Sequence, residues 1–373
     1  MLNYLKPFFT KASKAGALIA LHGAGRPQWT PRNLAALARE GFAGNVIGYR
    51  CVRMIAEAGA SVPLLTYVDG KEVEQHRLAS LLARPNPSQS GRDLIETLLA
   101  QLMVAGNAYA ELVSLDGEPR EIFALRPDRM AVVPSRSGFP EAYDYAVNGS
   151  ALRLPREAVL HLKLFHPLDD FYGLAPLEAA RRAIDTHNAA SAWNKAMLDN
   201  AARPSGALVF AAGDGQLTGE QFDRLKAELE ATYQGAANAG RPMILEGGLD
   251  WKEMGFSPKD MEFNEAKNMA AREVALAFGV PPMLLGIPGD NTYANYAEAN
   301  RVFWRQTVVP LLARTCEALA LWLEPHADGR LSVRPDLDQV EALAPDRDAL
   351  WKRVNEAVFL TVPEKRAAVG YGA

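Results

Sequence analysis

Apolar residues recur every three or four positions along much of the chain, which is the spacing of amphipathic helices. Residues 33–60 follow this spacing and predict two helices that separate around residues 41–44, where two glycines stand. In residues 92–105 four leucines share one helical face, and Gly106 follows as a stop signal. Local pattern alone therefore predicts three helices in the first third of the chain.

Short β-prone runs replace the helical spacing in two places. Residues 62–68 form one run, and the Asp69-Gly70 dipeptide after it favours a tight hairpin because glycine tolerates a positive φ. Residues 108–164 hold several more runs. Glycine-containing turns join them at Asp116-Gly117, Ser137-Gly138 and Asn148-Gly149. This alternation of runs and turns predicts an antiparallel meander.

Long helical segments dominate after Pro176. This proline fits a first helical turn, and the pattern continues for about 25 residues, which predicts a rod roughly 37 Å long. A second rod, residues 259–278, carries small residues on one face that would let a neighbouring helix come close. A third helix, residues 295–323, contains Pro310, which lacks the N–H for a helical hydrogen bond and predicts a kink.

The remaining segments complete a mixed α+β chain. Residues 203–255 alternate strand-like and helical patterns and predict a small α+β module between the first two rods. The glycine- and proline-rich segment before the third helix predicts a loop. A strand is expected over residues 330–335 and a helical tail over residues 346–368. The first thirty residues have weak periodicity and predict a loose arm, with order beginning near Asn33.

Charge is distributed unevenly along the chain. Its 373 residues carry 40 lysines and arginines against 44 acids, a formal net charge of −4. Residues 1–50 hold seven basic groups and one acid, which gives +6 and leaves −10 for the other 323 residues. A hydrophobic fraction of 49% excludes collagen-like, disordered and membrane-spanning classes. The acidic body argues against a nucleic-acid grip made by the body itself.

Cysteine usage and hydropathy bear on the compartment. Only Cys51 and Cys316 occur, both among apolar neighbours, which predicts buried free thiols and a cytosolic chain. Residues 11–25 have a basic start, but their apolar run is too short for a signal peptide. Glycine and proline interrupt the longest apolar stretch, residues 274–287, which is also shorter than a bilayer crossing requires. We therefore expect neither secretion nor a membrane span.

Motifs of common enzymes are absent from the sequence, which has no GxxxxGK[ST], GxSxG or HExxH. His161 and His166 lie five residues apart on a strand-like run, so a hydrogen-bonded strand histidine is favoured over metal ligation. Glu298, Arg301 and Arg305 share a helix face and are interpreted as an ordinary surface ion-pair face.

One acidic pair offers an alternative with metal chemistry. Asp169 and Asp170 could hold Mg²⁺ together with Glu246 or Asp250, as in a metal-dependent nuclease. Adjacent carboxylates before a helix are more often a turn and an N-terminal cap, and we favour that interpretation. No catalytic residue, metal or cofactor is therefore assigned.

Eight ordered motifs give the chain a resemblance to a known family. They are RPNPSQSG, GNAYAELV, LRPDRMAVVP, VLHLKLFHPLDDFYGLAPLEAA, NAARPSGALV, LEGGLDWKEMGFSP, AREVALAFGVPPMLLG and NTYANYAEANRVFWRQTVVPLL. With the tail FLTVPEKRAAVGY they are similar, over about residues 30–373, to phage portal proteins of the lambdoid-type family. Within that family the chain most resembles the portal proteins of gene transfer agents, which are phage-derived particles that package host DNA.

The resemblance implies an α+β portal-type subunit in a cyclic ring, usually of twelve copies, at one capsid vertex. Double-stranded DNA would be packaged and released through this ring. The implied parts are a flexible basic arm (1–29), a wing of meander and helices (30–175), stem helices (176–202 and 256–281), a clip (203–255), a tunnel loop (282–294), a kinked tunnel helix with its return to the wing (295–340) and a crown (341–373). This crown is shorter than in many relatives, which speaks against sensing of the head's filling by the crown.

The resemblance also implies site residues and partners. The tunnel loop would bring polar side chains to the DNA, namely Asp290, Asn291, Thr292, Tyr293 and Asn295. The clip would dock the large terminase subunit and later the head-tail adaptor, through Asp214, Gln216, Gln234, Asn238 and Arg241. Other copies of the chain and the major capsid protein are further partners, with no membrane. The implied location is the cytoplasm during assembly and afterwards the virion or gene transfer agent particle.

Elementary physics agrees with a ring. A compact chain of this length has a radius of gyration of roughly 21 Å, too small to enclose a duplex, so any channel lies between subunits. The small-residue face of the second rod is predicted to contact the next subunit. An acidic wall would let a polyanion slide, whereas a basic wall would hold it. Two other hypotheses stay open, the metal-dependent nuclease and a monomeric structural adaptor without a channel.

Overall fold

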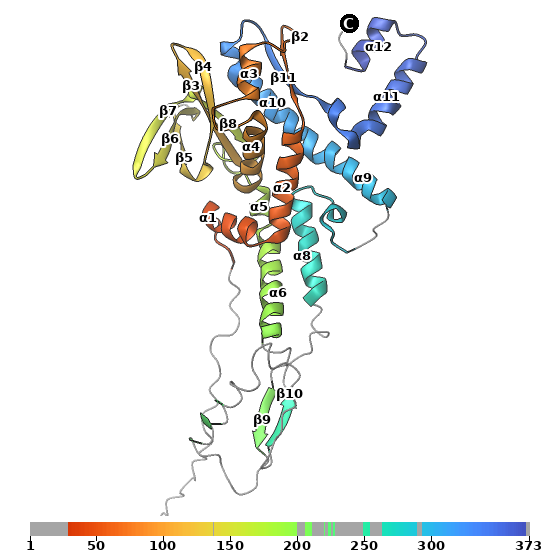
Figure 1. The fold of residues 1–373 in the computed structure, drawn as a ribbon. Helices are drawn as coiled ribbons and strands as arrows, with labels where there is room; N and C mark the ends of the chain where they lie inside the picture. The colour runs from red at the N-terminus through yellow and green to blue at the C-terminus, as the bar shows by residue number, and fades with distance from the viewer. Residues whose placement is uncertain are drawn as a thin grey trace, which may run out of the picture.

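The computed structural model describes residues 29–136, 138–199, 206–210, 220, 223–224, 227, 249–253, 263–288 and 293–370. These residues form a mixed α+β fold, the class that the sequence predicts. Helices and small sheets make up a body, from which two helices, α6 and α8, extend side by side as a stem (Figure 1). On the C-terminal side a second group of helices projects from the body as an arm (Figure 1).

The helices of the body surround one apolar core. They are α1 (Leu34–Leu37), a π-helical segment (Ala38–Ala43), α2 (Val46–Ser61), α3 (Arg77–Ala83), α4 (Gly91–Ala105) and α10 (Val309–Leu323). Ile55 of α2, Leu98 of α4 and Leu312 of α10 are fully buried in this core. Helices α2 and α4 pack directly on each other, so burial of their apolar stripes stabilises the body.

The two ends of α4 show how the residues that predict a helix start and a helix stop act in the structure. The Ser90 side chain accepts a hydrogen bond from the backbone N–H of Asp93, and the Asp93 carboxylate accepts one from the Ser90 backbone. At the other end Gly106 adopts the left-handed conformation with φ +70°. Asn45 likewise caps α2 by accepting from the N–H groups of Ile47 and Gly48. The predicted helices and the break near residue 44 are therefore confirmed.

The strands of the body form three small antiparallel sheets. Their members are β1 (Leu64–Val68), β2 (Lys71–Glu72) and β11 (Leu331–Pro335); β3 (Asn107–Leu115), β4 (Glu118–Leu125) and β8 (Val159–Lys163); and β5 (Met130–Pro134), β6 (Pro140–Val147) and β7 (Ser150–Pro155). The Asp69-Gly70 hairpin between β1 and β2 and the strand at residues 331–335 are confirmed.

The single meander expected over residues 108–164 is wrong in its topology. Strand β8 returns to pair with β3, with Ala108 opposite Leu162, so the segment divides into two three-stranded sheets. A small second core lies at these sheets and contains Tyr109, Leu125, Met130, Tyr143, Leu154 and Val159. The local alternation of apolar and polar residues cannot show that β3 pairs with a strand so far along the chain.

The stem consists of α5 (Pro176–Ala179), α6 (Arg181–Asp199) and α8 (Phe263–Ala277). Helices α6 and α8 run antiparallel and pack on each other (Figure 1). Ala270 and Val274 of α8 are buried within the single chain. The part of the predicted small-residue face around these two residues is therefore not available to the next subunit, because α6 and the body cover it, whereas Ala266 on the same face is exposed. Beyond the far end of the stem, β9 (Gly206–Phe210) pairs with β10 (Leu249–Glu253) (Figure 1).

The C-terminal arm begins with α9 (Tyr293–Phe303), which continues through a π-helical segment (Trp304–Val308) into α10. After β11 the chain forms α11 (Ala344–Glu356) and α12 (Val362–Ala368), so the predicted helical tail is confirmed with a break between its two helices. Single 3-10 turns lie at Pro127–Arg129, Arg156–Ala158, Pro282–Leu285, Glu324–His326, Leu337–Gln339 and Glu341–Leu343.

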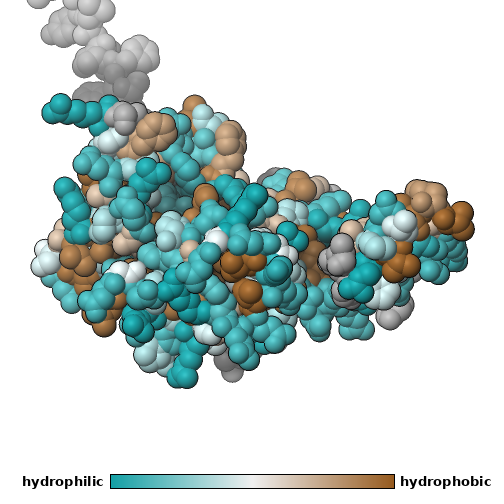
Figure 2. All heavy atoms as spheres, turned by 90° about the horizontal axis from the view of Figure 1, so that it is seen from above, coloured by the Kyte–Doolittle hydropathy of each residue, from teal (hydrophilic) through white to brown (hydrophobic). Residues whose placement is uncertain are grey.

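Apolar side chains lie exposed at the far end of this arm. From above, the arm shows patches of hydrophobic surface near its tip (Figure 2). Val358, Phe359 and Val362, around the turn between α11 and α12, are among the exposed large apolar residues. Among the helices that the structure describes, none has both the length and the apolarity needed to span a bilayer.

Candidate functional site

The predicted tunnel loop joins α8 to α9, and the described residues at its start are held against α8. On the first flank the 3-10 turn Pro282–Leu285 ends at Gly286, which has φ +71°, and Ile287 is buried. The guanidinium of Arg272 in α8 donates a hydrogen bond to the backbone carbonyl of Pro288. The loop is thus held close to α8 up to the point where the described residues stop.

The proposed DNA-facing residues lie mostly outside the described residues. This holds for Asp290, Asn291 and Thr292. Tyr293 is the first residue of α9, and Asn295 has an exposed side chain in the first turn of that helix. Contact of these five residues with DNA stays a prediction.

The helix after the loop is irregular at Pro310, as the sequence predicts. Pro310 is the second residue of α10, where a missing N–H is tolerated, and the π-helical segment immediately precedes α10. Thr307 in this segment donates a hydrogen bond of 2.6 Å to the backbone carbonyl of Gly279 at the end of α8. Gly279 has φ +67°, and a Cβ atom there would lie 2.7 Å from the Thr307 hydroxyl oxygen. The irregular turn therefore anchors the start of the loop segment.

The charged face of α9 is confirmed as a set of ion pairs, with one partner that sequence reasoning missed. Arg301 pairs with Glu298 and also with Asp346 at 3.5 Å, and Arg305 approaches Asp346 at 3.9 Å. Asp346 lies in the first turn of α11, so it links the helix after the loop to the C-terminal arm. Nothing in the sequence marks Asp346, because it lies more than forty residues from its partners.

The predicted clip is described only in part. Strands β9 and β10 pair antiparallel with Leu208 opposite Trp251, which confirms two of its predicted strands. All five proposed docking residues, Asp214, Gln216, Gln234, Asn238 and Arg241, lie outside the described residues. So does Glu246 of the nuclease hypothesis.

Asp169 serves as a turn cap. Its carboxylate accepts hydrogen bonds of 2.8 Å and 2.9 Å from the N–H groups of Phe171 and Tyr172. The bond from Tyr172 is the main reason that the Asp169 pKa is lowered. The backbone carbonyl of Asp170 accepts a hydrogen bond from the Lys163 ammonium. The hydrogen bonds from Phe171 and Tyr172 support the turn interpretation of Asp169. Within the described ranges no three His, Cys, Asp or Glu side chains gather as metal ligands.

Asn107 organises the same corner of the body. Its side-chain oxygen accepts hydrogen bonds from the Gly173 backbone at 2.8 Å and from Nε2 of His161 at 3.1 Å. Its amide donates to the Ala105 carbonyl at 2.9 Å. The sequence pattern did not mark Asn107 as this buried centre of hydrogen bonds.

His161 is a structural histidine, as predicted. Its ring stacks on Tyr109 with centroids 4.3 Å apart, and its Nδ1 lies 3.4 Å from the Tyr143 hydroxyl. Burial lowers the pKa of His161 to about 4, and the nearby positive charge of Lys163 contributes the smaller part of this shift. The ring is therefore neutral at physiological pH and unsuited to general acid catalysis there.

The two cysteines are free and buried, as predicted. Burial raises the pKa of both Cys51 and Cys316 to about 12. A thiol with such a pKa carries almost no thiolate at neutral pH, so neither residue is a nucleophile.

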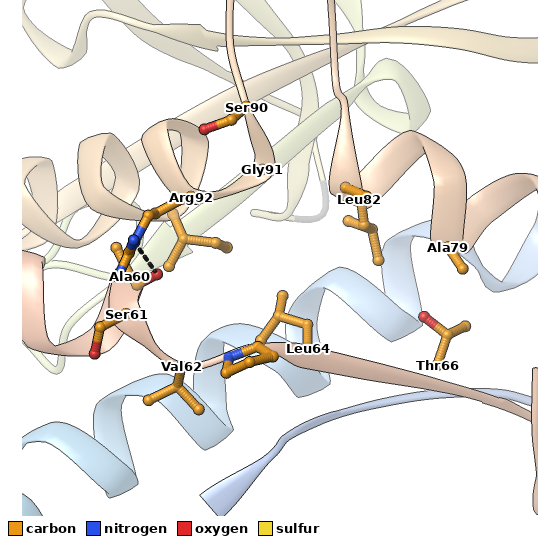
Figure 3. Close-up of a pocket in the computed structure, with 13 residues that line it drawn as sticks. Ala60, Ser61, Val62, Leu64, Thr66, Ala79, Leu82, Ser90, Gly91 and Arg92 are labelled. Atoms are coloured by element: carbon orange, nitrogen blue, oxygen red, sulfur yellow. Dashed lines mark hydrogen bonds between the residues drawn. The ribbon is translucent and has the colours of Figure 1, made fainter. Parts of the chain in front are cut away.

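A hollow of about 420 Å³ lies between the end of α2, the start of α4 and β1 (Figure 3). Most of its thirteen lining residues are apolar. Arg92 in its wall donates a hydrogen bond to the Ala60 carbonyl at 3.2 Å (Figure 3), and the Ser90 hydroxyl is engaged in the α4 cap. The lining holds no pair of acid and base, so it offers no candidate for general acid–base catalysis.

Comparison with known proteins decides among the remaining interpretations. Residues 47–370 match the family model described as phage portal protein. The chain belongs to the phage portal protein family. The resemblance recognised in the sequence motifs is thereby confirmed.

Individual relatives are similar to this portal-family chain over most of its length. An uncharacterized protein of Rickettsia bellii (strain RML369-C) is 42% identical over 340 residues, which are 89% of this chain and 88% of the relative. The portal protein of Enterobacteria phage HK97 is 26% identical over 330 residues, covering 85% of this chain and 76% of its own.

A solved structure extends the likeness to gene transfer agents. A chain in the neck of a native gene transfer agent particle, computed with twelvefold symmetry, is 55% identical and has a TM-score of 0.71. The likeness covers 93% of this portal-family chain and 96% of the other.

Proposed function

We propose that the chain forms a portal ring of twelve copies at one capsid vertex and that the ring is the conduit for packaging and release of double-stranded DNA. The observation that carries this proposal is the likeness, over 93% of the chain, to a protein in a particle neck computed with twelvefold symmetry. The elongated arrangement of body, stem and terminal β9–β10 pair supports it (Figure 1). Such a chain alone is too small to surround a duplex, so the channel lies between copies.

The parts of the ring follow the segments that the sequence resemblance assigns. We propose the body as the wing that meets the major capsid protein, α5, α6 and α8 as the stem, and α11 with α12 as the crown. The module around β9 and β10 would dock the large terminase subunit and then the head-tail adaptor. The division of the chain into these parts is a proposal that rests on the family.

The loop between α8 and α9 is proposed to face the DNA. The described residues before the loop are held by Arg272, which donates to the Pro288 carbonyl, and by Thr307, which donates to the Gly279 carbonyl. Replacement of residues 291–295 by glycine and serine should spare ring formation and reduce DNA retention in particles. Unchanged packaging would remove this assignment, and unchanged ring mass is the control.

We further propose a structural, non-enzymatic role, with assembly in the cytoplasm followed by incorporation into a virion or gene transfer agent particle. The neutral His161, the buried thiols and the Asp169 turn support this role, because none of them is a reactive group. Mg²⁺-dependent DNA cleavage that is lost in Asp170→Ala would contradict it and would favour the nuclease hypothesis.

The basic arm is proposed to reach the capsid shell or the DNA inside the head, while the acidic body surrounds the conduit. Residues 1–28 of this arm lie outside the described residues. Deletion of residues 1–29 should lower incorporation into capsids or DNA retention. If both are unchanged, the charge difference along the chain has no such role.

Light scattering together with negative-stain imaging of the purified full chain tests the proposed function. A ring should have a mass near twelve times 40.6 kDa and a central channel in end-on views. A monomer that assembles into such rings on concentration would also agree with the proposal. A chain that stays monomeric at high concentration and is absent as a ring from particles would contradict the proposal and favour the monomeric adaptor.

A further inference from the structure

We propose that the first nine residues of the chain dock into an apolar groove on the body of the same chain, between α1, α4 and the turn after β4. The inference concerns the single subunit and goes beyond the proposed ring. It gives the N-terminal arm a second attachment point, in addition to the one at Thr30 that the structure shows.

The apolar groove has a volume of about 580 Å³, within the range of about 300 to 1,000 Å³ that ligand pockets occupy. Half-buried apolar side chains from α1, the π-helical segment after it, α4 and the turn after β4 line it, namely Leu34, Ala38, Phe42, Ala100, Val104 and Pro127. Because these side chains are only partly removed from water, the groove favours binding of another apolar group.

The charged side chains at the groove are paired with one another. The Arg53 guanidinium lies 2.6 Å from the Glu96 carboxylate, and the Arg126 guanidinium lies 2.6 Å from the Asp128 carboxylate. The lining therefore holds two positive and two negative groups and has no net charge. DNA or a strongly charged peptide would gain little electrostatic attraction there, so the chemistry of the groove favours an apolar occupant.

The chain supplies such an occupant at its N-terminus. Residues 1–9, which lie outside the described residues, have the sequence MLNYLKPFF. Five of these residues have large apolar or aromatic side chains, namely Leu2, Tyr4, Leu5, Phe8 and Phe9. A segment this short cannot bury them by folding alone, and aromatic side chains are enriched at the centres of binding surfaces. A second apolar run in the arm, residues 17–21, has three large aliphatic side chains and no aromatic one.

The arm begins beside the groove. The Thr30 N–H donates a hydrogen bond of 2.9 Å to the Asp185 carboxylate in α6, and Arg181 donates one of 3.3 Å to the Thr30 carbonyl. These bonds fix the base of the arm at the junction of body and stem (Figure 1). The groove is close to this point in sequence, because Leu34 and Ala35 already line it.

A second hollow, of about 280 Å³, connects the base of the arm to the groove. Arg32 lines this hollow, two residues after Thr30. The hollow and the groove are adjacent because they share four lining residues, Leu34, Val104, Ala105 and Pro127. A continuous recess therefore leads from the start of the described chain into the groove.

The length of the arm favours the groove of its own chain. The twenty residues 10–29 span at most about 70 Å when fully extended, which is ample for a return to a groove beside residue 34. A linker of this kind holds the attached segment at an effective concentration of about 1 mM. A segment from a second copy or from another protein would have to compete with that concentration.

Docking would determine what the basic arm can reach. Lys11, Lys14 and Arg26 lie between the two attachment points, so docking would hold their charges in a loop at the junction of body and stem. Release of residues 1–9 from the groove would let the same charges reach further from the subunit. The groove would thus control the reach of the arm that is proposed to contact the capsid shell or the DNA.

A labelled peptide of residues 1–12 tests the groove in the full-length chain. The receiving chain carries Leu5→Ser, Phe8→Ser and Phe9→Ser, which keeps its arm and removes the apolar side chains that would occupy the groove. An arm that is docked most of the time at about 1 mM requires a Kd of about 0.1 mM or tighter for the free peptide. Fluorescence anisotropy measures this Kd, and absence of binding up to about 1 mM overturns the proposal.

Two matched variants of the receiving chain locate the binding site. Ala35 lines the groove and is exposed, so Ala35→Glu places a charge there without opening the core. It should weaken peptide binding by about tenfold or more, because docking would desolvate the carboxylate. Ala43 is also exposed but does not line the groove, so Ala43→Glu should leave the Kd within about twofold. Equal weakening in the two variants overturns the assignment to this groove.

Variants of the peptide show which of its side chains bind. Phe8→Ser with Phe9→Ser in the peptide should weaken binding by about tenfold or more, because two apolar side chains are no longer buried. Lys6→Ala should change the Kd by less than about twofold, because the groove has no net charge. The reverse order of effects, or tighter binding of a peptide of residues 13–24, overturns the choice of the first nine residues.

Photo-cross-linking in the otherwise unmodified full chain shows which groove is used. The photoreactive residue benzoylphenylalanine, introduced in place of Phe8, should link to α1 or α4 of the same chain. The product then keeps the mass of one chain in denaturing gels, and mass spectrometry locates the link. The same residue in place of Lys14 is the control and should give no preferred link to the groove. Covalent dimers overturn docking within one chain, and links outside the groove, or none, overturn docking itself.

The mass of the unmodified protein keeps this inference separate from the proposed function. Rings without peptide binding overturn the groove and leave the portal function intact. Peptide binding to a chain that forms no ring would support the groove and contradict the proposed function.

Discussion

In the body, α2, α4 and α10 bury leucines and isoleucines on facing stripes, whereas in the stem α6 and α8 meet mainly through alanines. A buried leucine contributes roughly 1.5 to 3 kcal/mol relative to an exposed one, and an alanine contributes much less. Both regions also leave some large apolar side chains in solvent, such as Leu321 of α10 in the body and Met269 and Leu276 of α8 in the stem. We therefore expect the body to be stable in one chain, and the stem, with its smaller buried core, to bury further apolar surface only in an assembly.

The largest effect expected from this difference follows substitution of one leucine in each region. Leu98→Ala in α4 should lower the free energy of unfolding by about 2 to 5 kcal/mol, because it opens a cavity in a closed core. Leu276→Ala in α8 should change it by less than about 0.5 kcal/mol, because the side chain is exposed in the monomer. Urea unfolding of monomeric protein measures both. Similar losses in the two variants would erase the distinction between body and stem.

A smaller effect is expected where backbones meet in the body. Gly106→Ala should cost about 1 to 3 kcal/mol from its positive φ alone. A further loss is expected because the new Cβ would lie 2.7 Å from the Ala175 backbone nitrogen, just before α5. The control is Gly117→Ala, where φ is +79° and no atom lies within 4 Å of the new Cβ, so only the φ cost applies. Equal costs in thermal unfolding would show that the body does not constrain the start of the stem at this contact.

The pH dependence of stability reports on one buried histidine in the body, His161, and one in the stem, His187. Unfolded His161 binds a proton near its ordinary pKa of about 6.5, but folded His161 does so only near 4, so the unfolded state takes up more protons in between. Stability should therefore fall by about 1 to 3 kcal/mol as the pH drops through this window, and His161→Gln should reduce that fall.

His187 in the stem has its pKa lowered by burial and then by the charge of Lys267, so its contribution has the same sign. Unfolding by urea at a series of pH values, with imidazole titration by NMR, measures both histidines. An unchanged pH dependence in His161→Gln would contradict the neutral buried state of this ring.

The smallest expected effect concerns a helix cap in the body compared with one in the arm. Ser90→Ala removes the cap of α4 and should cost about 1 kcal/mol. Thr361→Ala removes the matching capping box of α12, a helix of seven residues without buried side chains, and should cost less. Circular dichroism during urea unfolding gives both values. A larger loss in Thr361→Ala would mean that the arm contributes more to the monomer than its packing indicates.

Local chemistry explains which parts of the fold could be predicted. Helix α4 could be predicted from its leucine spacing and from Ser90 and Gly106 at its ends. The Asp69-Gly70 hairpin likewise depends on a few adjacent residues. The return of β8 to β3 and the pairing of Arg301 with Asp346 connect residues far apart in sequence, so periodicity cannot show them.

The local sequence pattern also cannot show which element packs against a given face of a helix. The small-residue face of α8 was expected to meet another subunit because small residues permit close helix packing. The fold buries Ala270 and Val274 of that face inside the chain and leaves Leu276 exposed. The family, in contrast, was predictable from ordered motifs, because these extend over nearly the whole chain.

The most direct test of a stem completed by the next subunit is a cryo-electron microscopy reconstruction of the ring formed by the full chain. We expect a closed ring in which Leu276 and Met269 of each subunit are buried against a neighbouring subunit. A closed ring in which Leu276 remains in solvent would contradict this assembly, as would a chain that forms no ring at all.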